Sequence, residues 1–109
     1  MRIVGKILRK QVEDQGLVRV TYPPFDVVVG IVDGKPYAIE DACNHAGSSL
    51  AESHLEGDCI ACPMHGYVFS IRTGALLRPK GLCDDQRTFE AWLEGDDIVI
   101  GDPFELVIR

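Results

Sequence analysis

Four residues with the chemistry of metal ligands form two closely spaced pairs near the middle of the chain. One residue separates Cys43 from His45, two separate Cys62 from His65, and the sixteen residues 46–61 lie between the pairs. Two thiolates and two imidazoles suit an iron–sulfur cluster with mixed ligands, in which cysteines hold one iron and histidines the other. The spacing therefore predicts such a cluster, with Cys43, His45, Cys62 and His65 as its ligands.

The residues around both pairs favour two short loops. In an extended Cys-x-His segment the two side chains point the same way, so that one loop can reach both irons of a small cluster. The second pair is followed by Gly66 and interrupted by Pro63, which together favour a tight turn. Each loop is thus expected to offer one thiolate and one imidazole.

Two other interpretations of these residues remain open. A single cysteine is more often a buried packing residue than a ligand, but that explanation weakens for four such residues in paired loops. The same four residues could instead surround one structural zinc ion, although a gap of one residue between ligands is unusual for zinc. We therefore favour the iron–sulfur cluster and keep the zinc module as the alternative.

The chain has two further cysteines, Cys59 and Cys83. Cys59 forms a Cys-x-x-Cys motif with Cys62, a spacing also used for zinc binding and dithiol chemistry. If residues 58–62 are extended, positions three apart face opposite sides, so Cys59 is expected to face away from the cluster as a small buried hydrophobic residue. Cys83 is expected to be a free thiol in a loop, and a disulfide between these two cysteines stays open.

Composition narrows the class of protein. A chain of 109 residues is expected to form one domain, residues 1–109, and its net charge of −6 argues against nucleic-acid binding. It contains no apolar run near the ~20 residues that a membrane span requires. Its N-terminal residues lack the apolar segment of a secretory signal, so we expect a cytoplasmic protein with reduced thiols.

The apolar pattern predicts a mostly β chain. Expected strands cover residues 18–22, 26–32, 37–39, 59–61, 88–93 and 98–100, with turns at 33–34, 73–74 and 94–97. Residues 48–54 are expected to form one helical turn, with Ser49 and Glu52 at capping-box spacing, and no long helix is expected. These elements indicate an antiparallel sandwich or small barrel, with residues 42–71 as a cluster-bearing insertion between its two halves.

The motif resembles that of the Rieske two-iron, two-sulfur family, which has C-x-H, a spacer of fifteen to seventeen residues, and then C-x-x-H. Residues 34–41 and 66–74 and Pro79 are also similar to the family's sequence around its ligand loops. The resemblance implies an all-β, Rieske-type antiparallel sandwich with a small cluster-binding subdomain between its halves, and one [2Fe-2S] cluster.

Soluble Rieske ferredoxins are the most similar members. They carry single electrons from a flavin-containing ferredoxin reductase to the terminal oxygenase of bacterial aromatic-ring hydroxylation. The resemblance therefore implies a monomeric electron-transfer protein rather than an enzyme. The small Rieske subunit of a reductase complex, similar to that of nitrite reductase, is the alternative.

The resemblance also suggests where the reduction potential lies. High-potential Rieske proteins carry one extra cysteine in each ligand loop, and these two cysteines form a disulfide. They also have a Ser and a Tyr that donate hydrogen bonds to the cluster. At the matching positions this chain has Ser48, Met64, Tyr67 and Phe69. We therefore expect a potential near the bottom of the Rieske range of roughly −150 to +300 mV.

Overall fold

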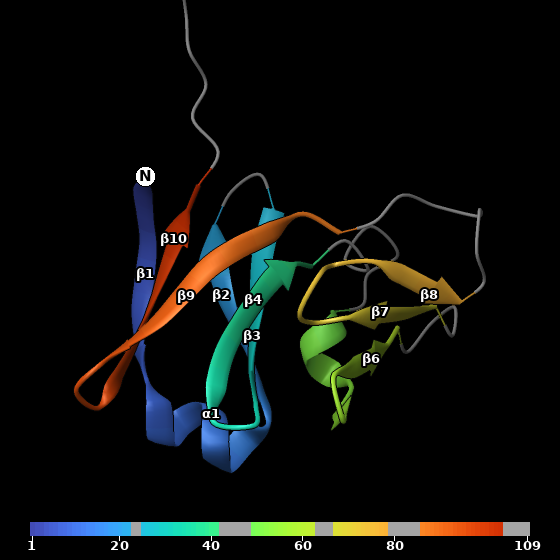
Figure 1. Cartoon of the computed structure of the whole chain (residues 1–109), viewed down its shortest axis with the longest axis horizontal. Helices are drawn as coiled ribbons and strands as arrows, with labels where there is room; N and C mark the ends of the chain where they lie inside the picture. The colour runs from blue at the N-terminus through green and yellow to red at the C-terminus, as the bar shows by residue number, and fades with distance from the viewer. Residues whose placement is uncertain (23–24, 42–48, 63–66, 79–85, 104–109) are drawn as a thin grey trace, which may run out of the picture.

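The computed structural model of the chain describes residues 1–22, 25–41, 49–62, 67–78 and 86–103. Most of these residues belong to two antiparallel sheets (Figure 1). The larger sheet has six strands in the order β1-β10-β9-β4-β3-β2: β1 Arg2–Leu8, β10 Asp97–Asp102, β9 Thr88–Glu94, β4 Lys35–Glu40, β3 Phe25–Val32 and β2 Leu17–Tyr22. The expected all-β antiparallel class is therefore confirmed.

The smaller sheet has four strands in the order β5-β6-β7-β8: β5 Leu55–Glu56, β6 Cys59–Ala61, β7 Val68–Ser70 and β8 Leu76–Arg78. It lies beside β3 and β4 of the larger sheet (Figure 1), and a 3-10 helix, η2, Leu50–Glu52, precedes it in the chain. Residue 71, the expected end of the insertion, lies between β7 and β8 of this sheet.

Strand β3 is buried on both faces, which explains its continuous apolar sequence. Val27 and Val29 belong to one hydrophobic core, whereas Val28 and Val32 belong to another. The first core joins strands from both ends of the six-stranded sheet, because it also contains Val18 of β2, Phe89 of β9, and Ile98 and Ile100 of β10. The second joins this sheet to the smaller one and contains Leu17, Ile39, Leu50, Ile60 and Ile71. Because successive side chains of a strand point to opposite faces, one strand serves both cores.

The expected turns mostly agree with the structure. Asp33 and Gly34 have φ values of 52° and 79°, as a tight hairpin turn between β3 and β4 requires. Gly74 and Gly95 also have positive φ, of 74° and 60°, in the β7–β8 and β9–β10 connections. Hairpin turns expected at 33–34, 73–74 and 94–97 are therefore confirmed.

The expectation of strands broken by turns over the first forty residues was incomplete. Arg9–Gln15 form an α-helix, α1, and the strand β1 before it was not predicted. The helix has one buried residue, Val12, and no side-chain hydrogen bond caps its N-terminus, so the usual sequence signals of a helix are missing. Gly16 ends it at φ 84°, with its N–H donating to Val12 O.

Candidate metal centre

The first expected ligand pair, Cys43 and His45, lies outside the described residues, but both ends of its loop are described. Asp41 leads into the loop from β4 and is fully buried. Its N–H donates to Asp26 O at 2.9 Å, so the neighbouring strand β3 holds the start of the loop.

Side chains tie the two ends of this loop together. The Asp41 carboxyl group accepts a hydrogen bond from the Ser49 hydroxyl and another, at 2.9 Å, from Leu50 N–H. Ser49 Oγ in turn accepts from Ala51 N–H at 3.1 Å, so Ser49 caps η2 as its spacing suggested. The spacing of Ser49 and Glu52 predicts the cap, but the bond to Asp41 was not predicted, because nothing in the local pattern shows that the two side chains meet.

The second pair begins at Cys62, directly after β6, whereas His65 lies outside the described residues. Cys62 is 3% exposed, and its N–H donates to Tyr67 O at 2.7 Å. This bond joins the two described residues that flank residues 63–66, whereas the turn expected from Pro63 and Gly66 lies outside the described residues.

The bases of both loops belong to one packed cluster. Leu50, next to the end of the first loop, and Cys62, at the start of the second, share a hydrophobic core with Ile60 and Phe69. By residue type, the buried Cys62 together with Cys43, His45 and His65 in the sequence fits the donor set of a mixed-ligand [2Fe-2S] cluster. The described part of the site therefore suits this cofactor.

A third loop, residues 79–85, contains Pro79 and Cys83 and lies outside the described residues. After it, Gln86 N–H donates to Gly74 O at 2.6 Å. A side chain at Gly74 would lie 2.1 Å from Gln86 O, so only glycine allows this close approach of the two segments. The end of the third loop is thereby held against the β7–β8 turn.

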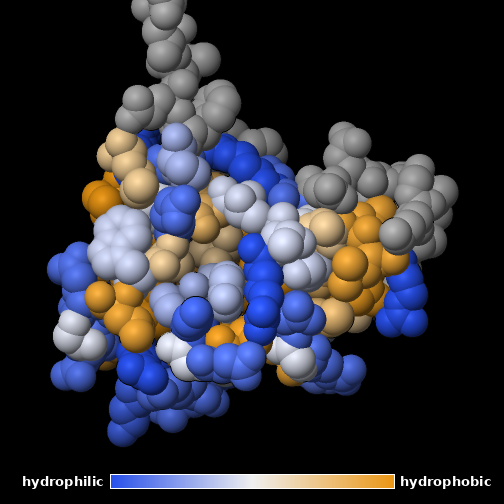
Figure 2. Space-filling view, viewed as in Figure 1, coloured by the Kyte–Doolittle hydropathy of each residue, from blue (hydrophilic) through white to orange (hydrophobic). Residues whose placement is uncertain are grey.

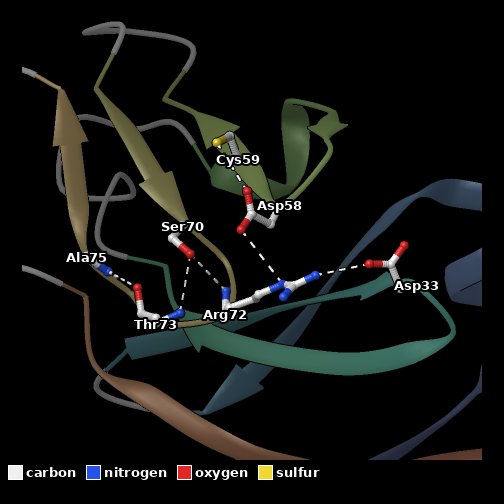
Figure 3. A network of polar contacts seen from close by, with 7 residues as sticks. All are labelled: Asp33, Asp58, Cys59, Ser70, Arg72, Thr73 and Ala75. Atoms are coloured by element: carbon white, nitrogen blue, oxygen red, sulfur yellow. Dashed lines mark hydrogen bonds and ion pairs between the residues drawn. The ribbon is translucent and has the colours of Figure 1, made fainter.

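Of the four positions compared with high-potential Rieske proteins, Tyr67 and Phe69 are described, and Ser70 beside them carries a further hydroxyl. Phe69 is 2% exposed and packs in the core with Cys62. The Ser70 hydroxyl points toward the β7–β8 turn, where it accepts from Arg72 N–H at 3.2 Å and Thr73 N–H at 3.4 Å (Figure 3). Ser70 is therefore a turn-stabilising residue.

Cys59 differs in part from the expectation. It lies away from the core that holds Cys62, as expected, but it is half-buried and lines a surface recess with Ser53, His54, Glu56, Ala61, Val68 and Arg78. The prediction of a buried hydrophobic residue was therefore wrong. Its thiol donates to Asp58 Oδ1 at 3.5 Å, and desolvation and this carboxylate raise the pKa of Cys59.

Arg72 connects the two sheets on the surface (Figure 3). Its guanidinium lies 3.1 Å from Asp33 Oδ2, in the β3–β4 turn of the larger sheet, and 3.7 Å from Asp58 Oδ2, between β5 and β6 of the smaller one. It also lies over the Tyr37 ring, 5.8 Å from the ring centroid.

No helix among the described residues is long and apolar enough to cross a membrane.

A two-sheet β fold, with one Cys/His pair in the sequence on each side of η2 and β6, has the features of an iron–sulfur protein of the Rieske class. The model of the Rieske [2Fe-2S] domain matches residues 5–83, and the chain belongs to this family. Its cofactor is accordingly one Rieske-type [2Fe-2S] cluster, as expected from the sequence.

Sequence relatives are consistent with this assignment. The ferredoxin component of biphenyl 2,3-dioxygenase from Rhodococcus jostii is 37% identical over 86 residues, 77% of this chain and 78% of that protein. The ferredoxin subunit of 3-phenylpropionate/cinnamic acid dioxygenase from Photorhabdus laumondii is 31% identical over 96 residues, 84% and 86% of the two chains.

A solved complex of reduced oxygenase and oxidized ferredoxin in carbazole 1,9a-dioxygenase contains a similar chain, with a TM-score of 0.75 and 25% identity over 98% of this chain and 96% of that one. The expected role of a one-electron carrier, rather than an enzyme, is confirmed by these relatives.

Proposed function

We propose that this protein receives single electrons from a flavin-containing ferredoxin reductase and delivers them to the terminal oxygenase of an aromatic-ring-hydroxylating dioxygenase system. Two relatives named as ferredoxins of such dioxygenases match about four-fifths of the chain, and a similar ferredoxin has been solved with its oxygenase. The reductase, the cytoplasmic location and the monomeric state are parts of this proposal.

Cys43 and Cys62 are proposed to hold one iron, and His45 and His65 the other. The observation that supports this arrangement best is the burial of Cys62 at the end of β6, in the same core as the base of the first loop. Packing there would keep water from an iron held by the cysteines, and His45 and His65, which would hold the other iron, are proposed as the exit for the electron. When bound, the cluster supplies reversible one-electron chemistry.

A low potential follows from the same residues. Two neutral imidazoles in place of thiolates make the cluster less negative and raise its potential above that of plant-type ferredoxins. Within the Rieske range, hydrogen bonds to the cluster raise the potential further. Phe69 has no hydroxyl, and the Ser70 hydroxyl points to the β7–β8 turn, where it accepts two backbone bonds, so we propose a value near the lower end, suited to a flavin donor.

The chain is proposed to form one domain over residues 1–109, with the cluster-binding part inserted from about residue 42 to residue 71. Support comes from the division into two sheets, because β1 to β4 precede the smaller sheet and β9 and β10 follow it. The smaller sheet continues to Arg78 of β8, so its strands run past residue 71.

Iron and sulfide analysis with electron paramagnetic resonance of the dithionite-reduced protein tests the cofactor and its ligands. We expect two irons and two acid-labile sulfides per chain. His45→Ala or His65→Ala should abolish the visible absorption of the wild type. His54→Ala is the matched control, since this imidazole is exposed and pairs with Glu56 at 2.9 Å.

One zinc ion per chain, or unchanged absorption after either histidine substitution, would contradict the proposed site.

Stopped-flow reduction by a flavin-containing reductase, followed by oxidation by a terminal oxygenase, tests the carrier role. Stable co-purification with a large reductase subunit would instead favour the role of a small Rieske subunit.

A further inference from the structure

Asp41 is a buried acidic residue that the electron-carrier role does not by itself explain. It is 0% exposed and its carboxyl group accepts from the Ser49 hydroxyl and from Leu50 N–H. None of the ion pairs among the described residues involves Asp41. Burying an acidic group is costly unless hydrogen bonds satisfy it, so the bonds from Ser49 and Leu50 are the contacts that stabilise Asp41 among the described residues.

The position of these contacts indicates the task. Asp41 immediately precedes residues 42–48 and Ser49 immediately follows them, so the bond between their side chains joins the two ends of the first ligand loop. The backbone adds a second attachment at each end: Asp41 N–H donates to Asp26 O, and Glu52 N–H donates to Ser49 O at 3.0 Å.

The same contacts relate the first loop to the second. Leu50, whose N–H bonds to Asp41, is fully buried in the core that contains Cys62. Two residues of chain span at most about 7 Å, so Cys43 stays close to the Asp41 anchor. A shift of the first loop relative to Cys62 would have to break buried hydrogen bonds, which are strong and costly to leave unpaired.

We infer that Asp41 and Ser49 are positioning residues for the cluster: their side chains clamp the base of the first ligand loop and thereby set the geometry and retention of the bound cluster. This inference rests on the proposed ligand residues. It assigns a role to two residues that are not ligands themselves.

Two substitutions weaken the clamp in different ways. Ser49→Ala removes the donor to Asp41 and the acceptor of Ala51 N–H, whereas Asp41→Asn keeps the shape and one acceptor oxygen but replaces the other with an amide NH2 group that cannot accept. For both we expect shifted g values in the reduced protein and loss of the visible absorption to a chelator that is about tenfold faster or more. Ser49→Thr, which keeps the hydroxyl, should restore wild-type behaviour.

Ser70→Ala is the matched control. Ser70 is also a buried serine, 6% exposed, and its hydroxyl accepts two backbone bonds at the end of β7 that is farther in the chain from residues 63–66. Its loss should lower the melting temperature to a similar degree without altering the g values. If Ser49→Ala does not fold, the inference is tested by comparing Asp41→Asn with Ser49→Thr. The same two quantities, the g values and the rate of cluster loss to a chelator, are measured for both variants.

Spectra and chelation rates for Ser49→Ala and Asp41→Asn that match those of Ser70→Ala would overturn the inference, because the clamp would then be structural only. A wild-type protein without the [2Fe-2S] cluster would refute the proposed function instead, so the two failures are distinguishable.

Discussion

Gly30 tests how closely the cluster-bearing sheet packs on the larger one. It lies in the interior of β3, and a methyl group added there would be 2.8 Å from Ile71 Cδ1, 3.0 Å from Leu17 Cδ2 and 3.4 Å from Leu55 Cδ2. Ile71 is fully buried, so its side chain has little room to move away. We therefore predict that Gly30→Ala forces the two sheets apart and destabilises the fold.

The magnitude follows from two opposing terms. Overpacking a buried site costs about 1–3 kcal/mol, whereas replacing glycine by alanine gains about 0.4–1 kcal/mol through the unfolded chain. With both terms near the middle of their ranges, the net loss is about 1–2 kcal/mol. At roughly 4–8 °C per kcal/mol for a small domain, the melting temperature should fall by about 4–16 °C.

Thermal unfolding followed by far-ultraviolet circular dichroism, with visible absorption as a second probe, measures this loss. Gly5→Ala is the control, because a methyl group there would meet only Val20 Cγ1 at an ordinary 3.5 Å. Ile71→Val removes the Cδ1 atom in closest contact, so the double variant with Gly30→Ala should lose less stability than the sum of the single ones. Wild-type stability of Gly30→Ala, or simple additivity with Ile71→Val, would refute the reasoning.

Three further predictions concern the cluster and the surface network. Phe69→Tyr should raise the reduction potential, measured by protein-film voltammetry. The increase should be at most about 60–130 mV if the new hydroxyl gives the reduced cluster a charge-assisted hydrogen bond of about 1.5–3 kcal/mol. An unchanged or lower potential would remove our explanation of the low potential. Asp58→Asn should lower the raised pKa of Cys59, because the Asp58 carboxylate disfavours the thiolate. The substitution should therefore speed the alkylation of Cys59, measured by peptide mass spectrometry at neutral pH. An equal rate would mean that Asp58 does not contribute to the raised pKa. Arg72→Ala should cost no more than about 1 kcal/mol, since its pair with Asp33 is partly exposed, and the difference from wild type should shrink in 1 M salt; a larger, salt-independent loss would indicate that packing over Tyr37 dominates.

The candidate site was readable from the sequence because ligand chemistry depends on residue type and short spacing. A Cys-x-His and a Cys-x-x-His segment specify one donor set wherever the loops lie, so family and cofactor followed from four residues. The strand Cys59–Ala61 and the hairpin turns at Gly34, Gly74 and Gly95 were also evident, since period-two patterns and positive φ act locally.

Some local elements nevertheless escaped prediction. Helix α1 and strand β1 were missed because α1 buries only Val12 and lacks a side-chain cap, so little in the sequence distinguishes it from a turn. The prediction that Cys59 is buried was also wrong, because a side chain that points away from one core need not enter another. Its exposure depends on how β6 is covered by its neighbours, and a recess lies there.

The sequence alone determined the β character of the chain and the turns and predicted the donor set, because all three depend on residue type and neighbouring residues. Tertiary structure alone decided which distant residues meet: Asp33 with Arg72, thirty-nine positions apart, and Gly30 with Ile71. Even Asp41 and Ser49, eight positions apart, are paired only because β4 and η2 converge at one buried point. Such contacts arise from the packing of whole sheets, which no local pattern encodes.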